Sequence, residues 1–163
     1  MKTAFSSLKA KHYSANSSSP SHLSCEEFYA LIGYDRSTLN KQHADYTNTS
    51  AARMSLALLG ASISFRGRLQ IKAGEYSGRM IETRAGLLAD QLARNNVFGQ
   101  PEIFTTPAEA PAQIVGRRGV IFFRKISGYD GGHIDLIDAS NAAATFNSHC
   151  YFNCQQVWFW ELS

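Results

Sequence analysis

The stretch from Gly116 to Asn141, GRRGVIFFRKISGYDGGHIDLIDASN, predicts two strands of one sheet. Its first part, Val120 to Phe123, is a short run of apolar β-branched and aromatic residues. A loop rich in Gly and Asp follows, and a second apolar run extends from His133 to Ile137. Two such runs separated by turn-forming residues are typical of neighbouring strands.

The second strand carries a pair of polar residues on one face. Successive side chains of a strand point to opposite faces, so His133 and Asp135 share a face while Ile134 lies on the other. Gly132 directly before the strand has no side chain to cover the imidazole. The pair therefore predicts a chemically accessible histidine, although a structural histidine beside a turn has the same spacing.

Length and hydropathy limit the kinds of protein that this chain can be. A chain of 163 residues, of which 44% are hydrophobic, is long enough for one globular domain with a core. No apolar run approaches the roughly 20 residues of a membrane span, and the N-terminal MKTAFSSLKAKHY lacks the apolar stretch of a secretory signal. We expect no membrane insertion, and export only by a dedicated machine.

The charge does not favour nucleic acid as a partner. The net charge is +3, and the basic residues are scattered without interleaved aromatic residues. A polyanionic cell wall fits this mild charge equally well. The chain has no CxxC pair and no His/Cys cluster at zinc spacing, so we expect neither a metal nor another cofactor.

The three cysteines are Cys25, Cys150 and Cys154. The pair at 150 and 154 is compatible with a short disulfide loop or with two reduced thiols. Cys25 is the odd one, and its place in the first turn of a predicted helix makes it a candidate nucleophile, because a helix N-terminus lowers a thiol pKa.

Helices are predicted mainly in the first half of the chain. A short helix near residues 4–13 precedes a polar linker, residues 14–21. Ser24 and Glu27 have the spacing of a capping box, so a helix is expected from about Cys25 to Ile32.

The central helix is expected at residues 50–60, SAARMSLALLG. Asn48 and Thr49 offer a cap, and the helix is apolar nearly all round, which predicts burial on every side. Ser50 opens this helix, where unpaired N–H groups and the helix dipole stabilise an anion. Ser50 is therefore a candidate nucleophile, or else an ordinary polar residue at a helix start.

The remaining segments complete an α+β pattern. We expect a loop from Gly60 to Gly78 with a short strand at residues 69–72, a helix at 79–94, a linker at 105–113 and an aromatic-rich strand at 157–162. Helices precede strands, which favours a mostly antiparallel sheet packed on the central helix.

Two motifs together resemble a known family. Residues 48–55, NTSAARMS, are followed in the right order and at the right separation by residues 132–136, GHIDL, and by a closing FWEL at 159–162. This combination resembles the fourth family of type VI secretion amidase effectors, from about residue 46 to the end. The first 45 or so residues resemble its variable N-terminal helices, so residues 1–163 are expected to form a single amidase domain.

The resemblance implies a fold and an activity. Such effectors are similar in fold to papain-like NlpC/P60 peptidases, with a cysteine heading the central helix, a histidine opening a strand and a third polar group orienting the imidazole. The implied reaction is cleavage between D-glutamate and meso-diaminopimelate in the peptide stem of peptidoglycan. The implied place is the periplasm of a rival Gram-negative cell, reached through the type VI secretion machinery, and the implied partner is a cognate immunity protein.

The chain departs from the family at two catalytic positions. Ser50 stands where the family has its cysteine, either as an introduced Cys→Ser substitution that silences the enzyme or as the residue of a natural pseudoenzyme. The family usually has an aspartate beyond the histidine, near the first cysteine of the pair, where this chain has none in residues 142–145. Asp135 is our candidate for this third group, with Asp138 and Asn147 behind it.

Further site residues follow from the resemblance. The loops at residues 44–49 and 128–132 flank the two reacting residues, so Tyr46, Tyr129 and Gly132 are candidate substrate contacts. The pair of Cys150 and Cys154 also resembles that family, and we expect these two residues to form a disulfide. Two other functions remain open: a non-catalytic module that binds cell wall, and a thiol acyltransferase on a related fold.

Overall fold

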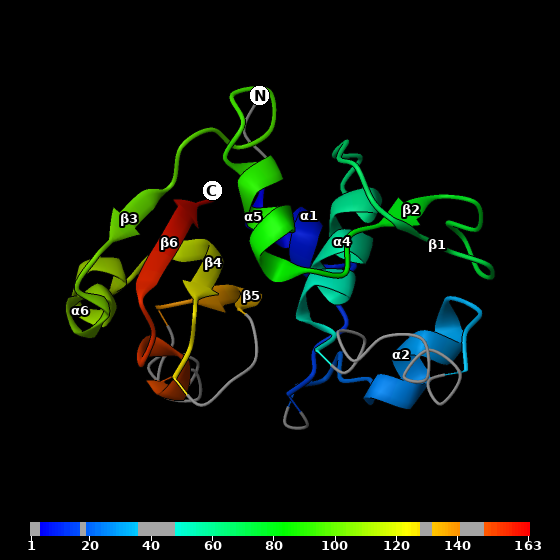
Figure 1. The fold of residues 1–163 in the computed structure, drawn as a ribbon, viewed down its shortest axis with the longest axis horizontal. Coiled ribbons are helices and arrows are strands. Elements are labelled where there is room, and N and C mark those ends of the chain that lie inside the picture. The colour runs from blue at the N-terminus through cyan, green and yellow to red at the C-terminus, as the bar shows by residue number, and fades with distance from the viewer. Residues whose placement is uncertain (1–3, 17–18, 36–47, 128–131, 141–148) are drawn as a thin grey trace.

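The framework of the molecule is a four-stranded sheet in which the paired strands are antiparallel (Figure 1). The computed structural model describes residues 4–16, 19–35, 48–127, 132–140 and 149–163. In spatial order the strands are β3 (Glu102–Phe104), β6 (Gln156–Glu161), β4 (Arg118–Arg124) and β5 (His133–Asp138). The strand with the His/Asp pair therefore lies at one edge of the sheet.

Helix α4 (Ser50–Gly60) packs between this sheet and a second layer. One side of it contributes Met54 and Leu58 to a core cluster that also contains Phe122 of β4 and Ile134 of β5. The opposite side packs on helix α2 (Cys25–Leu31) and on the two-stranded sheet of β1 (Leu69–Gln70) and β2 (Met80–Ile81). Residues 50–59 are all buried, so the prediction of a central helix covered on all sides is confirmed.

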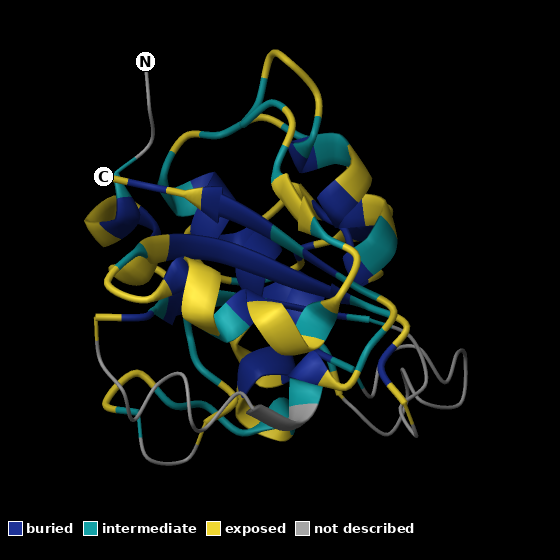
Figure 2. Ribbon diagram, turned by 90° about the vertical axis from the view of Figure 1, so that its left-hand side faces the viewer, coloured by how far each residue is buried: buried dark blue, intermediate teal, exposed yellow. Residues whose placement is uncertain are grey.

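The second face of the main sheet has its own core. Ile121 and Phe123 of β4 alternate with the residues that face α4, as the pleat of a strand requires, and pack with Phe159 of β6. Helix α6 (Ala110–Ile114) and the short helix η3 (His149–Phe152) cover this face. Figure 2 shows the resulting dark band of buried strands between partly exposed helices.

The N-terminal segment is part of the folded structure. Helix α1 (Phe5–Lys9) places Phe5 and Leu8 in the same core cluster as the sheet-facing side of α4. The Phe5 N–H also donates to the carbonyl oxygen of Ser163 at 2.9 Å, which ties this segment to the residues that follow β6. The predicted capping box of α2 is confirmed, since Ser24 Oγ accepts from the Glu27 N–H and the Glu27 carboxylate accepts from the Ser24 N–H.

Two predicted boundaries are wrong. The helix expected at residues 79–94 covers only Ala85–Leu92 (α5), because residues 80–81 pair with β1 and bury Ile81 in the second cluster. The linker expected at residues 105–113 contains the short helix η2 (Pro107–Glu109) and most of α6. Its two prolines lie in first turns, where the missing N–H removes no helical hydrogen bond.

The α+β class, with a central helix on an antiparallel sheet, is confirmed. Within the described ranges, no helix combines the length and the hydropathy that a bilayer crossing requires.

Ser55 joins the central helix to the segment between β2 and α5. Its buried hydroxyl donates to the carbonyl oxygen of Glu82 at 3.0 Å and accepts from the Glu82 N–H at 3.1 Å. One side chain thus satisfies both backbone groups of a buried residue that has left the strand ladder.

We expect Ser55→Ala to lower the free energy of unfolding by about 1–3 kcal/mol, because it leaves a buried N–H and a buried carbonyl unpaired. Urea unfolding followed by circular dichroism measures the change. The matched control is Ser7→Ala, at an exposed position of α1, which should change stability by less than about 0.5 kcal/mol. Equal stability of the two variants would contradict the role of Ser55.

Candidate active site

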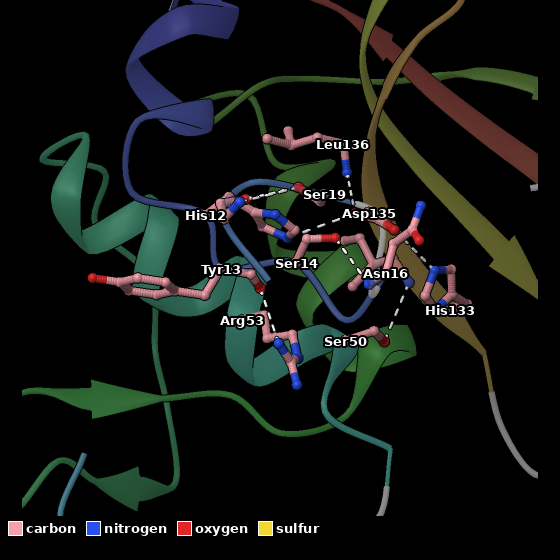
Figure 3. Close-up of polar contacts among 12 residues, drawn as sticks. His12, Tyr13, Ser14, Asn16, Ser19, Ser50, Arg53, His133, Asp135 and Leu136 are labelled. Carbon is pink, nitrogen blue, oxygen red and sulfur yellow. Dashed lines mark hydrogen bonds and ion pairs between the residues drawn. The ribbon is translucent and has the colours of Figure 1, made fainter. Parts of the chain in front are cut away.

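Ser50 and His133, predicted from separate motifs, are brought together by the packing of α4 on β5. Ser50 is the first residue of α4 and is buried, with 7% of its surface exposed. Its Oγ accepts from the backbone N–H of Ile134 at 3.4 Å, and Ile134 follows His133 directly in β5. The hydroxyl therefore lies against the strand at the position of the histidine (Figure 3).

Asn48 bridges the two elements that carry these residues. Its Oδ1 accepts from the Ser50 N–H at 3.2 Å, and its Nδ2 donates to the carbonyl oxygen of Gly132 at 2.8 Å. The predicted cap of α4 is therefore supplied by Asn48, whereas Thr49 forms no side-chain cap and instead accepts from Arg53 Nε at 2.7 Å. One amide side chain thus fixes the start of the helix against the start of the strand.

His133 is buried and held between aromatic rings. It keeps 7% of its surface, and Tyr151 of η3 stacks on its imidazole with a centroid distance of 4.1 Å and an interplanar angle of 11°. Nε2 donates to Asp135 Oδ2 at 3.2 Å. Nδ1 is buried and has no hydrogen-bond partner among the described residues. A ring nitrogen in that state is able to take up a proton from a neighbouring group.

Asp135 orients the imidazole from the side opposite to this nitrogen. Its Oδ2 accepts from His133, and its Oδ1 accepts from the Leu136 N–H at 2.8 Å. Burial raises the pKa of Asp135, but the hydrogen bond from His133, the nearby His12 and the Leu136 N–H together outweigh burial. The pKa of this carboxyl therefore lies below its usual value, and the group is ionised at neutral pH.

Gly132 lies where no side chain fits. A Cβ at this position would come within 2.8 Å of both the Phe122 ring and the Phe123 carbonyl oxygen. The sequence indicated that this glycine keeps the imidazole accessible, and close packing against β4 is a second reason for it. Contact between Gly132 and a substrate stays a prediction.

Three other predicted site residues, Tyr46, Tyr129 and Asn147, lie outside the described residues. Asp138, a second candidate for the third catalytic group, accepts from Ser140 through both its backbone N–H and its hydroxyl. Asp138 lies on β5 five residues beyond His133, and its hydrogen bonds with Ser140 stabilise the turn that ends the strand.

The structure describes the side chains of two of the three cysteines, Cys25 and Cys154. The Cys154 thiol is free, donates to the carbonyl oxygen of Gln156 at 3.3 Å and has its pKa raised by burial. The side chain of Cys150 lies outside the described part of the chain, so the Cys150–Cys154 disulfide stays a prediction for the oxidised protein, while this structure holds Cys154 reduced. Cys25 packs in the core cluster of α2, β1 and β2, on the other side of α4 from the sheet.

A groove of about 510 Å³ opens beside the His/Asp pair. One wall is the edge of β5, including His133 and Asp135, and the other is the N-terminal segment, which contributes small polar side chains. These are Ser14, Asn16, Ser19 and Ser21, three of which are labelled in Figure 3. The described residues contain no group of three or more His, Cys, Asp or Glu side chains arranged to hold a metal ion.

Sequence reasoning missed three contributors to the site. His12 Nε2 lies 3.6 Å from Asp135 Oδ1, yet the sequence placed this residue only within the short helix expected near residues 4–13. Asn48 was identified as a cap but not as a bridge to Gly132, which is distant in sequence. Tyr151 carried no signal, since stacking on His133 depends on how η3 returns to the sheet.

Comparison with known proteins gives one family match. A family model described as Tae4, type VI secretion system (T6SS) amidase effector protein 4, matches residues 46–160. No curated protein sequence matches the chain.

Solved structures of such effectors share the fold. The Tae4/Tai4 effector–immunity system of Salmonella typhimurium aligns with a TM-score of 0.70 at 18% identity, and the Tae4–Tai4 complex of Enterobacter cloacae with 0.68 at 21%, each over 100% of both chains. Tae4 alone from Enterobacter cloacae aligns with a TM-score of 0.67 at 22% identity, over 100% of this chain and 98% of that one.

We expect the free energy of unfolding of Asp135→Asn to fall less steeply in acid than that of the parent. Because the folded-state pKa of Asp135 lies below the unfolded value of about 3.9, its stabilisation is present above that value and is lost as the pH falls through the folded pKa. Urea unfolding between about pH 5 and pH 2 should therefore show a steeper acid decline for the parent. Asp90→Asn, which alters an exposed carboxylate, is the control; parallel curves for the parent and Asp135→Asn would contradict this expectation.

We expect Asn48→Asp to destabilise the fold by about 1–3 kcal/mol at pH 7, because a carboxylate still accepts from Ser50 but cannot donate to Gly132. The measurement is urea unfolding, with the exposed Asn95→Asp as the matched control. A loss no larger than that of the control would mean that the Asn48 bridge contributes little.

Proposed function

Because the chain belongs to the Tae4 family of type VI secretion amidase effectors, we propose that it has the architecture of a peptidoglycan amidase with Ser50 at the position of the nucleophile. The substrate proposed is the peptide stem of peptidoglycan, and the bond is the amide between D-glutamate and meso-diaminopimelate. The whole chain, 1–163, forms the amidase domain in this proposal, on a fold related to NlpC/P60 peptidases.

One observation carries the proposal: the first residue of α4 lies against β5 beside a buried histidine whose Nδ1 is unpartnered among the described residues. Asp135 binds the other nitrogen, Nε2, and so supports the tautomer in which Nδ1 is free to accept a proton. A nucleophile, a base and a group that orients the base are the parts that covalent acyl transfer needs.

With cysteine at position 50, the reaction proceeds in two halves. His133 takes the thiol proton, and the thiolate attacks the amide carbonyl carbon to form a tetrahedral intermediate. The carbon–nitrogen bond then breaks as His133 protonates the leaving amine, and a thioester remains. In the second half His133 removes a proton from water, the hydroxide attacks the thioester, and the thiol and a carboxylate are released.

Backbone N–H groups are available for the negative charge of the intermediates. The Ile134 N–H already points at the Ser50 oxygen, and the first turn of α4 supplies further donors and the positive end of its dipole. The Ser50 N–H donates to Asn48 at 3.2 Å, a long bond that an oxyanion would compete for.

Serine at position 50 makes this mechanism inefficient. A thiol paired with histidine is partly ionised near neutral pH, whereas a serine hydroxyl is a much weaker acid and needs a more strongly activating base. We propose that the present chain is an inactive or nearly inactive form, whether Ser50 is an introduced replacement or natural.

The biological setting follows from the family. We propose that the protein is delivered by the type VI machinery into the periplasm of a Gram-negative target cell, and that an immunity protein resembling Tai4 protects the producer. The polar groove beside His133 is the proposed binding site for the stem peptide, since its hydroxyl and amide side chains suit a peptide rich in hydrogen-bonding groups.

A second candidate function is a pseudoenzyme that binds the cell wall without cutting it. The observation that favours it is Ser50 itself, in an otherwise assembled site. This candidate predicts equal binding to purified sacculi whether position 50 carries serine or cysteine, and no new amine termini in either case.

The test compares three proteins on purified sacculi: the chain as it stands, Ser50→Cys, and Ser50→Cys/His133→Ala. We expect Ser50→Cys to release muropeptides with a new diaminopimelate amine, detected by amine labelling and mass spectrometry. The other two should cut at least about a hundredfold more slowly, because each lacks the thiol or the general base.

If none of the three proteins cuts, the catalytic proposal fails. If Ser50→Cys and the double variant cut equally well, His133 is not the base. If amines appear only when an acyl acceptor is consumed, the reaction is transfer instead of hydrolysis.

A further inference from the structure

The catalytic cluster contains a residue from outside the region matched by the family model. That model begins at residue 46, yet His12 lies at the site with 8% of its surface exposed. Its Nε2 is 3.6 Å from Asp135 Oδ1, while His133 Nε2 is 3.2 Å from Asp135 Oδ2. Asp135 thus lies between two imidazoles, one on each oxygen (Figure 3).

Asp135 needs support from outside its own strand. It lies on an edge strand, faces the groove and keeps 36% of its side-chain surface exposed, so water competes for its oxygens. Within the strand, Oδ2 accepts from the His133 ring that it orients, and Oδ1 accepts from the Leu136 N–H. His12 covers that same oxygen from the N-terminal segment, and limits how far the carboxylate can turn away from His133.

His12 is fixed in place by the helix that carries the nucleophile position. Arg53 of α4 donates through one guanidinium nitrogen to the carbonyl oxygens of Tyr13, at 3.2 Å, and Leu23, at 2.7 Å. Tyr13 is the residue next to His12, and Arg53 itself is buried with 2% of its surface exposed. The segment with His12 is therefore hydrogen-bonded to α4 on both sides of its loop.

The charge state of His12 suits a supporting role. Burial lowers the pKa of His12, and Arg53 and His133 lower it further, while Asp135 opposes them. His12 Nε2 lies 3.6 Å from Asp135 Oδ1, which is longer than a hydrogen bond, so a neutral His12 packs on the carboxylate without cancelling its charge and leaves that charge to stabilise the His133 imidazolium. A protonated His12 would compete with His133 for the same carboxylate.

We propose that His12 is a positioning residue of the catalytic centre, acting through Asp135 to hold the ring of His133 in its reactive orientation. The proposal rests on the function proposed above for the reaction it serves, but the arrangement His12–Asp135–His133 exists in the serine-containing chain and is testable there. It extends the active site into the N-terminal segment.

The first measurement uses the Ser50 chain as it is. Two-dimensional nitrogen–proton NMR of the histidine side chains reports which ring nitrogen of His133 carries the proton and how fast the Nε2 proton exchanges with water. In His12→Ala we expect at least a tenfold faster exchange of that proton and a mixture of tautomers, because Asp135 is freer to leave the imidazole. His12→Gln, which retains an N–H donor, should restore part of the protection.

His22→Ala is the matched control. His22 belongs to the same N-terminal segment and donates through Nδ1 to the carbonyl oxygen of Ser14 at 3.2 Å, a contact that does not involve Asp135. We expect the His133 signals to be unchanged in this variant. Unchanged His133 signals in His12→Ala, with the backbone spectrum still that of the folded protein, would overturn the proposal.

The second measurement uses the Ser50→Cys background and separates positioning from substrate contact. We expect His12→Ala to lower kcat about tenfold with KM changed less than about twofold, as for loss of a group that acts through another. In Asp135→Ala, removal of His12 should cost no further activity, because the carboxylate through which it acts is gone. A raised KM at unchanged kcat, or losses that multiply in the double variant, would mean that His12 acts independently of Asp135.

The two measurements distinguish failure of the proposed reaction from failure of the positioning role of His12. If Ser50→Cys does not cut peptidoglycan but the NMR effects of His12→Ala appear, the proposed reaction fails and the positioning role stands. If Ser50→Cys cuts and His12→Ala changes neither the spectra nor kcat, the positioning role fails and the proposed reaction stands.

Discussion

The site depends on a set of hydrogen bonds, here called the polar joint, between the start of α4 and the start of β5. Three hydrogen bonds make it: Asn48 to Gly132, Ser50 to Asn48, and the Ile134 N–H to the Ser50 hydroxyl. Apolar packing of α4 on the sheet presses the two elements together, but it has no directional preference and would tolerate a small slide. The polar joint removes that freedom, because its donors and acceptors meet in one register.

The sequence predicted those parts of the molecule that local patterns determine. The apolar helix at residues 50–60, the capping box at Ser24 and the shared face of His133 and Asp135 each follow from short-range rules and are confirmed. The two motifs that hold Ser50 and His133 were sufficient to place both residues in one site. Assignment of the chemistry to that site remains a proposal.

What the sequence could not predict depends on contacts between distant segments. Met80 and Ile81 fit a helical stripe as well as a strand, and only pairing with Leu69 and Gln70 selects the strand. His12 carries no local sign of its role, because its partner Asp135 lies on an edge strand that the N-terminal segment reaches only in the folded chain. In the role proposed for His12, a segment outside residues 46–160, which the family model matches, would support the site.

Among the described residues nothing pairs with the buried Nδ1 of His133, and this bears on how tightly the proposed site would bind a ligand. A buried polar atom without a hydrogen bond destabilises the folded protein by about 1–3 kcal/mol. Any bound molecule that brings an N–H or O–H to that nitrogen removes this penalty, and the recovered free energy adds to its affinity. In the proposed function, part of the affinity for a substrate or a blocking protein would therefore come from pairing this one nitrogen.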